Sequence, residues 1–574
     1  MANMLSIRID KNVEMPMRDG VILRADVWRP NDDRAYPALV SRTPYQKERM
    51  VGNDFLPYDR AAAAGYAVVV QDTRGRFASG GEWEGLMWHR EAPDTYDTVE
   101  WIAAQSWCNG DVGLWGISYL AAICWLGAME RPPHLKAIAP AMVSDGPLGT
   151  VEVGGAFRLE SLMNWFIFQL ISDVLPKHIK TGTATPEMID KLNEAARNPR
   201  LVTEYLPLKK SPYLDVPGCP VTLDQLFSQG LNIPKFRFED VEVPALLVGG
   251  WFDIATNALV EEFRALRSRG GGGEKVRQAH RLIMGPWIHA ASLPGYQGEL
   301  NFGLLSQGIF ELLSAHLAFF DQHLKGIEAS LPLIRYFLMG ANEWRNAEDW
   351  PVPGAIRQDW YLDSGGHANT SAGDGTLMTE APKRGGQPDR YRYDPADPVR
   401  THGGKVLSLG ESVAGPFSQQ HVEMREDVLC YSSKIFDQPI DIVGPVILRL
   451  YAASNARDTD FMAKLIDVFP DGRSMLVCEG CRRARFRLGF DREVFLKPSA
   501  VEEYEINLAH TAWRVKPGHR LRVHVTSSNF PHLDRNMNTG NAIGDDAEGI
   551  IAEQTIFHDE RRASRLELYI LPVN

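Results

Sequence analysis

The stretch VGLWGISYLAAICW, Val112 to Trp125, is a short apolar run that ends in Gly-Ile-Ser-Tyr and continues at once into a helix-like apolar run. This pattern around Ser118 is typical of a nucleophile elbow, a strained strand-to-helix turn that presents a serine hydroxyl at a sheet edge. The usual motif is Gly-x-Ser-x-Gly, and here Gly116 fills its first position but Leu120 its last. The motif alone leaves a second interpretation open, in which Ser118 merely caps the following helix.

Strand-like and helix-like segments alternate on both sides of this stretch. Residues 13–30 predict two strands joined by a turn at Asp19–Gly20. Further strands are predicted at 36–45, 65–75, 135–143, 243–251 and 280–287, with helices at 94–107 and 255–269. This alternation predicts a mostly parallel sheet that is covered by helices on both faces.

Two long segments depart from the alternation. Residues 147–240 are rich in aromatic and amphipathic helical pieces, which favours a helical insertion over an ordinary loop. From about Gln358 the chain consists of short β-rich runs separated by turn residues, which predicts an all-β sandwich or jelly roll. We therefore expect an α/β domain formed by residues 1–146 and 241–353, a helical cap at 147–240 and a β domain at 354–574.

A serine nucleophile needs a base, and the base needs a carboxylate that orients it. Asp253 directly follows one apolar strand and His289 directly follows the next, in the order serine, acid, histidine. The carboxyl ends of parallel strands are where open α/β sheets place their sites. Each residue alone also has an ordinary structural interpretation, since an aspartate often caps a helix and the chain has 15 histidines. Order and strand context together favour a Ser118–His289–Asp253 triad.

The chain resembles the cocaine esterase family, within the X-Pro dipeptidyl-peptidase group that also holds α-amino-acid ester hydrolases and glutaryl-cephalosporin acylases. The matching motifs run in the same order from about residue 10 to the C-terminus and are PMRDGVILRADVWRP, RTPYQK, VVVQDTRGRFASGGEWE, GLWGISYL, GGWFDI, GPWIH, DTDFMAKLIDVFPDG and SSNFPHLDRNMNTG. The resemblance implies an α/β-hydrolase fold with an inserted helical cap and a C-terminal jelly roll. It also implies ester or amide hydrolysis through an acyl-enzyme on Ser118, with Tyr45 and the backbone N–H of Tyr119 as oxyanion donors.

The chain departs from its relatives after the expected acid. α-Amino-acid ester hydrolases carry acidic residues there that bind the substrate's ammonium group, whereas this chain has Ile254, Ala255 and Thr256. A second departure, Ala121 where the family often has glycine, adds one methyl group. The lack of acidic residues at Ile254–Thr256 favours substrates with neutral acyl groups. Acyl pockets are mostly apolar, and among the cap aromatics (Trp165, Phe166 and Phe168) we select Trp165 as the pocket residue.

Composition limits the other functions. The formal net charge of −12, from 61 basic and 73 acidic residues, argues against a nucleic-acid binder. We find no apolar segment long enough to span a bilayer and no signal peptide. The six scattered cysteines are typical of a protein in a reducing cytoplasm. The lone Cys478-x-x-Cys481 pair and the segment Asp534–Gly540 do not match a zinc or calcium site, so we expect no metal and no cofactor.

The sequence thus predicts a cytoplasmic serine esterase that acts on a small ester with an apolar or aromatic acyl group. An amidase, an acylase or an X-Pro dipeptidyl-peptidase of the same group would use the same triad and stays open. The alternative from another class is a non-catalytic binding protein with a degenerate hydrolase domain. Oligomeric state is not readable from the sequence, a homodimer being one option.

Overall fold

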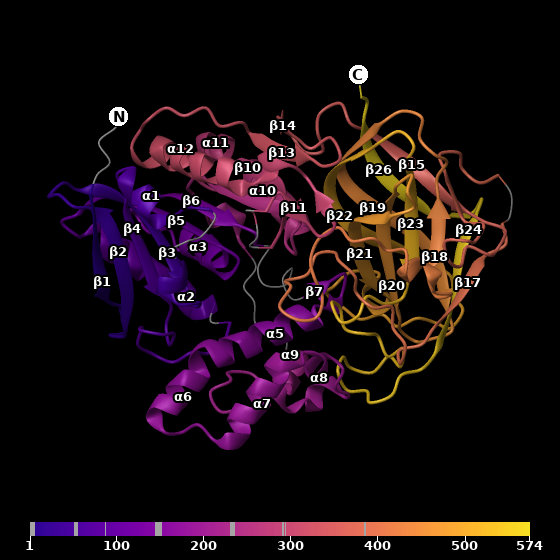
Figure 1. The fold of residues 1–574 in the computed structure, drawn as a ribbon, viewed down its shortest axis with the longest axis horizontal. Coiled ribbons are helices and arrows are strands. Elements are labelled where there is room, and N and C mark those ends of the chain that lie inside the picture. Colours follow the sequence, from indigo (N-terminus) through magenta and orange to yellow (C-terminus); the bar gives the residue numbers. More distant parts are fainter. Residues whose placement is uncertain are drawn as a thin grey trace.

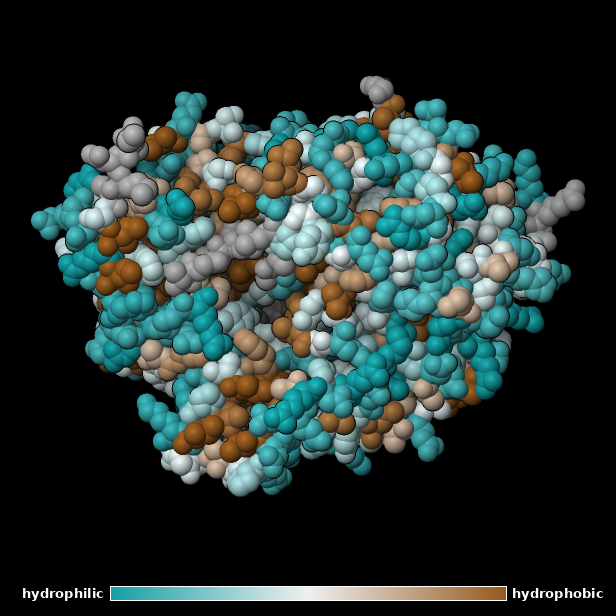
Figure 2. Space-filling model, in the orientation of Figure 1, coloured by the Kyte–Doolittle hydropathy of each residue, from teal (hydrophilic) through white to brown (hydrophobic). Residues whose placement is uncertain are grey.

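The computed structural model describes residues 6–50, 55–86, 88–143, 152–229, 236–289, 292, 294–383 and 386–573. Three parts lie against one another: an α/β domain, a helical segment below it in the view, and a β-rich domain beside both (Figure 1). Hydrophilic side chains cover most of the face in Figure 2, and hydrophobic ones appear on it in small groups.

The α/β domain is built on a ten-stranded sheet in the order β1-β2-β4-β3-β5-β6-β9-β10-β13-β14. Its middle, from β4 to β13, is parallel, and both ends are antiparallel. The strands are β1 Ile7–Pro16, β2 Ile22–Pro30, β3 Tyr36–Thr43, β4 Ala67–Asp72, β5 Cys108–Ile117, β6 Leu135–Ala141, β9 Leu246–Phe252, β10 Arg281–Ile288, β13 Ile334–Leu338 and β14 Glu343–Ala347. The predicted parallel sheet is therefore present, and strands β3, β4 and β9 are buried along their whole length.

Helices cover both faces of this sheet. Helices α2 (Trp88–Ala103), α3 (Tyr119–Met129) and α10 (Thr256–Arg269) pack into one hydrophobic core. Helices α1 (Tyr58–Ala63) and α12 (Leu312–Leu324) pack into a second core on the other face. A short helix, α11 (Gly273–Ala279), follows α10. This double cover explains the continuous apolar runs of the central strands.

The helical segment contains α5 (Leu159–Gln169), a π-helical turn (Leu170–Val174), α6 (Leu175–Thr181), α7 (Pro186–Arg197), α8 (Arg200–Thr203) and α9 (Leu223–Gln229). Its side chains form a core of their own, which includes the fully buried Met163, Phe166 and Leu192. These helices lie within the cap expected at 147–240. The first boundary of that cap falls outside the described residues, so the boundary stays a prediction.

The C-terminal domain is β-rich, and nearly all of its strand pairs are antiparallel. Its strands are β15 Ile356–Asp363, β16 Thr376–Met378, β17 Asp389–Tyr393, β18 Leu429–Ser432, β19 Ile440–Ser454, β20 Asp460–Val468, β21 Ser474–Arg483, β22 Glu502–Val515, β23 Arg520–Thr526, β24 Ala552–Asp559, β25 Arg562–Ala563 and β26 Arg565–Leu571. Strand β22 pairs with β19 and lies toward the α/β domain in Figure 1.

Two details differ from the sequence expectations. Helix α2 begins at Trp88 rather than near Asp94, and Pro93 lies inside it. The hairpin β13–β14 extends the first sheet beyond β10, although the sequence patterns above include no strands there. Each strand of this hairpin has five residues, too few to give a long periodic signal.

Candidate active site

Ser118 stands at the junction between β5 and α3 in a backbone conformation that is rare for a serine. Its φ of 59° and ψ of −124° lie outside the regions that L-residues commonly adopt. Its carbonyl oxygen accepts the N–H groups of Ala121 and Ala122 at 2.9 and 3.0 Å, which starts the helix. Its side chain makes no capping hydrogen bond to α3, whose residues are all described. The structure therefore contradicts the side-chain-cap interpretation and matches the strained turn of a nucleophile elbow.

The departure from Gly-x-Ser-x-Gly has a steric explanation. A Cβ atom on Gly116 would lie 2.5 Å from Cβ of Leu120, so only glycine fits at that position. Strand and helix thus approach closely at Gly116, and Leu120 fills the space that the glycine leaves. Leu120 itself is 1% exposed and belongs to the core beneath the elbow.

Asp253 and His289 form a close pair. His289 Nδ1 lies 2.6 Å from Asp253 Oδ2, and the two side chains are 10% and 1% exposed. The second oxygen of Asp253, Oδ1, accepts the backbone N–H of Ala255 at 2.7 Å, which fixes the carboxylate. Because this carboxylate holds Nδ1, the geometry leaves Nε2 as the nitrogen that can accept a proton from a nucleophile.

The sheet explains why Ser118, Asp253 and His289 lie at one edge. Ser118 follows β5, Asp253 follows β9 and His289 follows β10, and these parallel strands end at the same edge. Strands β9 and β10 approach so closely that a Cβ on Gly250 would lie 2.2 Å from the carbonyl oxygen of Trp287. The register between them shifts between Gly285 and Ile288, just before His289. Ser118, Asp253 and His289 thus share one edge of the sheet. In the chain, His289 lies 36 positions after Asp253 and 171 positions after Ser118.

Tyr45 follows β3, the strand beside β5 in the sheet, and its hydroxyl contacts the cap. The indole N–H of Trp165, on α5, donates to the Tyr45 oxygen at 2.9 Å. Desolvation raises the pKa of Tyr45 to about 12, against smaller opposite effects of its hydrogen bonds with Trp165 and with the Ser118 side chain. At neutral pH the phenol is therefore protonated and can donate a hydrogen bond next to Ser118.

Trp165, the residue selected for the acyl pocket, contacts both oxyanion candidates, and its role in a pocket stays a prediction. Its ring stacks on Tyr119 at 6.2 Å between centroids, with 13° between the planes. Phe168, which is 40% exposed, lies 6.3 Å from the Tyr45 ring, whereas Phe166 is fully buried in the cap core. Trp165 and Phe168 thus lie at the site, and Phe166 does not.

The other oxyanion candidate, Tyr119, is the first residue of α3, and a buried network holds its ring. Its hydroxyl donates to Glu91 Oε1 at 3.1 Å. Glu91 Oε2 in turn forms a 2.7 Å ion pair with Arg42, and both side chains are fully buried. Desolvation raises the pKa of Glu91, and the neighbouring Arg42 opposes this shift. The sequence analysis missed Glu91 and Arg42, because their pairing spans 49 residues of chain and no local motif marks it.

Arg158, just before α5, is a second residue that the sequence analysis missed. Its guanidinium group donates to the carbonyl oxygen of Ile254 at 2.9 Å and to that of Lys405 at 3.4 Å. It thereby connects the cap, the loop that carries Asp253 and the β domain. Desolvation lowers the pKa of Arg158 to about 10, and the nearby Asp253 carboxylate opposes this shift. A single arginine before a helix gives no sequence signal for such a role.

The remaining sequence candidates lie elsewhere. The six cysteines are free, and Cys478 and Cys481 are both buried in β21. Within the described ranges no group of His, Cys, Asp or Glu side chains could hold a metal ion. Asp534 accepts the backbone N–H of Phe157 at 2.7 Å and pairs with Arg483, so it joins the cap segment to the β domain. None of the helices in the described part of the chain has the length and hydrophobicity that a bilayer crossing requires.

Comparison with known proteins shows the family. Residues 19–291 match the X-Pro dipeptidyl-peptidase (S15 family) model, and residues 325–567 match the model of the X-Pro dipeptidyl-peptidase C-terminal non-catalytic domain. The chain is 36% identical over 565 residues to a cocaine esterase of Rhodococcus sp. (strain MB1 Bresler), and the alignment covers 93% of each protein. The chain is a cocaine esterase-like member of the X-Pro dipeptidyl-peptidase (S15) family. The resemblance that the sequence motifs indicate is thereby confirmed.

This cocaine esterase-like protein is a serine ester hydrolase of that family. Solved structures agree on the fold. An aminopeptidase from a Thaumarchaeota archaeon superimposes with a TM-score of 0.77 at 24% identity, covering 100% of this chain and 97% of that one. An α-amino acid ester hydrolase superimposes with a TM-score of 0.76 at 22% identity, covering 99% and 97%. An N-terminal α/β domain and a C-terminal β-rich domain are thus shared across these proteins.

Proposed function

We propose that this hydrolase cleaves small carboxylic esters with a neutral apolar or aromatic acyl group, through an acyl-enzyme on Ser118. The observation that carries the proposal is the 2.6 Å pair of His289 and Asp253 at the same sheet edge as the strained Ser118. A serine hydroxyl becomes a useful nucleophile when an oriented imidazole takes its proton.

In the proposed reaction, Ser118 Oγ attacks the ester carbonyl carbon while its proton moves to Nε2 of His289. Asp253 stabilises the imidazolium that forms and keeps the ring in the required tautomer. The tetrahedral intermediate collapses, the ester C–O bond breaks, and the alcohol leaves with the proton from His289. A water molecule then attacks the acyl-enzyme by the same route and releases the carboxylic acid.

The negative charge on the intermediate's oxygen needs donors that are already in place. We assign this role to the hydroxyl of Tyr45 and the backbone N–H of Tyr119. The first stays protonated because its pKa is raised, and the second is part of the rigid turn after Ser118. Each such donor typically contributes about 3–4 kcal/mol to transition-state stabilisation.

The acyl group would contact Trp165, which lies against both oxyanion residues. An amidase or X-Pro dipeptidyl-peptidase of the same family would use the same residues, so relative rates on p-nitrophenyl esters and X-Pro anilides separate the two. We assign the esterase because the 36% identical relative bears that name.

We further propose that the C-terminal domain is a jelly roll. We also propose that the enzyme acts in the cytoplasm, because its six cysteines are all free, as is usual in a reducing compartment.

The experiment that tests the assignment is active-site labelling with a fluorophosphonate. The wild-type chain and a Ser314→Ala control, altered at an exposed serine of α12, should both be labelled, and Ser118→Ala should not. Ester hydrolysis should be lost almost completely in Ser118→Ala and in His289→Ala, and the double variant should lose little more because the residues act as a unit. Labelling or turnover that persists in Ser118→Ala would refute the assignment.

A further inference from the structure

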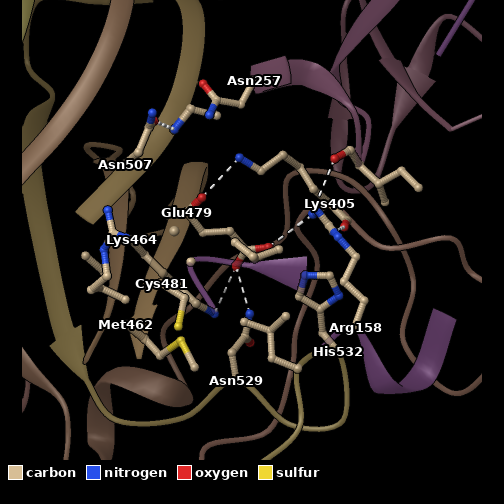
Figure 3. Close-up of a pocket in the computed structure, with 18 of the residues that line it drawn as sticks. Arg158, Asn257, Lys405, Met462, Lys464, Glu479, Cys481, Asn507, Asn529 and His532 are labelled. Carbon is tan, nitrogen blue, oxygen red and sulfur yellow. Dashed lines mark hydrogen bonds and ion pairs between the residues drawn. The ribbon is translucent and has the colours of Figure 1, made fainter. Parts of the chain in front are cut away.

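A polar cavity of about 280 Å³ lies between the α/β domain, the cap segment and the β domain (Figure 3). Its wall includes Ile254 and the start of α10 on one side and strands β20 to β22 on the other. Neither Ser118 nor His289 is among the described residues that line it. At about 30 Å³ per water molecule it could hold roughly nine waters, or one small organic molecule.

The inner part of this cavity is unusually rich in buried cations. Arg158, Lys405 and Lys464 line it, and they are 5%, 9% and 2% exposed. Glu479 is the buried carboxylate of the wall, and Asp253 lies close enough to Arg158 to offset part of its charge. Three positive groups against these two carboxylates leave one positive charge in excess.

The hydrogen bonds within the cavity do not use all of these donors. Each lysine ammonium has three N–H groups. Lys405 Nζ donates to the carbonyl oxygens of Glu479 and Leu508, both at 3.0 Å. Lys464 Nζ donates to Gln419 Oε1 at 3.0 Å and lies 3.8 Å from Glu479 Oε2. Desolvation lowers the pKa of both lysines, which an anion in the cavity would counteract.

Three further buried polar atoms of the wall have no hydrogen-bond partner among the described residues. They are Nε of Arg158, Oδ1 of Asn529 and Nδ1 of His532. The orientation of the Asn529 amide is fixed, because its Nδ2 donates to Glu479 Oε2 at 3.1 Å. Its Oδ1 is therefore an acceptor that needs a donor, and leaving a buried acceptor unpaired is costly.

From this donor set we propose that the cavity binds a small hydroxycarboxylate. The carboxylate would pair with the free N–H groups of Arg158, Lys405 and Lys464, and the hydroxyl would donate to Asn529 Oδ1. A ligand could enter at the outer end, where Phe490 is 59% exposed and Arg482 and Glu505 line the wall. Arg158 also donates a hydrogen bond to the carbonyl oxygen of Ile254. The bound anion would therefore stabilise the contact between the α/β domain, the cap segment and the β domain.

The test is calorimetric titration of the full-length protein with L-malate, succinate and inorganic phosphate at constant ionic strength. We expect one malate site per chain. Succinate, which lacks the hydroxyl, should bind at least about fivefold more weakly because Asn529 then stays unpaired. Phosphate should also bind more weakly than malate. Absence of malate binding at millimolar concentration would overturn the proposal, as would equal affinity for malate and succinate or for malate and phosphate.

Two variants localise the site. Ala258→Phe fills the cavity from the half-buried start of α10, and Lys464→Met removes one cation. Each should weaken malate binding about tenfold or more, whereas Lys516→Met, at an exposed lysine, should leave it unchanged. Ester hydrolysis without malate reports whether each variant folds. If Lys464→Met does not fold, Ala258→Phe still decides, because full binding in that variant would contradict the assigned cavity.

Discussion

The indole N–H of Trp165 donates a 2.9 Å hydrogen bond to the phenol oxygen of Tyr45, across 120 residues of chain. This bond occupies an acceptor site on the oxygen, so the hydroxyl proton must point elsewhere. The Ser118 side chain is close enough to the same hydroxyl to lower its pKa slightly. The cap helix α5 therefore orients the donor that we assign to the oxyanion hole.

Replacing Trp165 tests this orienting role. Trp165→Phe keeps an aromatic ring over Tyr119 but removes the N–H, so we expect kcat on a neutral aryl ester to fall about tenfold while KM changes little. Trp165→Ala should also raise KM, because it removes the side chain that we propose to contact the acyl group. Steady-state kinetics of the two variants provides the measurement. An unchanged kcat in Trp165→Phe would show that the hydrogen bond has no role in the reaction.

Tyr45→Phe removes the proposed donor itself. We expect kcat/KM to fall by roughly 10²–10³-fold, the usual loss for one oxyanion donor. Because the pKa of Tyr45 is raised to about 12, the phenol stays protonated through the accessible alkaline range. The pH–rate profiles of the wild type and the variant should therefore have the same shape between about pH 7 and 10. An alkaline decline in the wild type that disappears in Tyr45→Phe would contradict this assignment.

Acid should destabilise the protein partly through His316, a fully buried residue of α12. Desolvation lowers its pKa from 6.5 to about 4. The unfolded chain then binds the proton more readily than the folded one, so the stability linked to this group is present above pH 6.5 and is lost as the pH falls toward 4. At pH 5 the loss amounts to about 2 kcal/mol.

His316→Leu removes this titration and keeps a similar apolar volume. Whatever its stability at pH 7, the variant should lose about 2 kcal/mol less than the wild type on going to pH 5. Urea unfolding of both proteins at the two pH values measures the difference. Equal losses in the two proteins would mean that other groups account for the acid sensitivity.

The β domain should be required for a folded and active α/β domain. Trp350, 1% exposed, stacks on Trp251 at 5.5 Å, and its indole N–H donates to His510 of β22 at 3.0 Å. A fragment that ends at Pro353 would expose this apolar surface and leave the Arg158 contact to Lys405 unmade. We expect the fragment to aggregate or to lack esterase activity in size-exclusion and kinetic assays. A soluble, fully active fragment would show that the β domain is dispensable.

Local patterns were enough to predict the parts of the fold that depend on neighbouring residues. The strands before Ser118, Asp253 and His289 end in apolar runs, which are typical of buried parallel strands. Glu91, Arg42 and Arg158 were missed because each acts through partners 28 to 247 residues away. A charged residue that is buried by tertiary contacts looks the same in sequence as one on the surface.

The segment after Asp253 allows a test of whether the enzyme accepts a positive charge on the substrate's acyl group. Ile254, Ala255 and Thr256 are buried, and the Thr256 hydroxyl donates to the carbonyl oxygens of Gly250 and Asp253. The charged groups that are hydrogen-bonded to this segment are the Arg158 guanidinium and the Asp253 carboxylate, which already accepts the Ala255 N–H and pairs with His289. An ammonium group placed here would meet the Arg158 cation and a carboxylate that is already held by His289, and it would lose its hydration at a cost of roughly several kcal/mol.

The enzyme should therefore prefer neutral acyl groups, which gain roughly 25 cal/mol per Å² of apolar surface that they bury. The comparison is kcat/KM for phenylacetic acid methyl ester against phenylglycine methyl ester, at a pH where the amine is charged. The two esters differ by one ammonium group, so their ratio isolates its effect. We expect phenylacetate to be favoured by at least about tenfold, equivalent to about 1.4 kcal/mol. A clear preference for phenylglycine would mean that an anion elsewhere binds the ammonium group, Glu82 and Glu84 of the exposed GEWE loop being the first candidates to replace by glutamine.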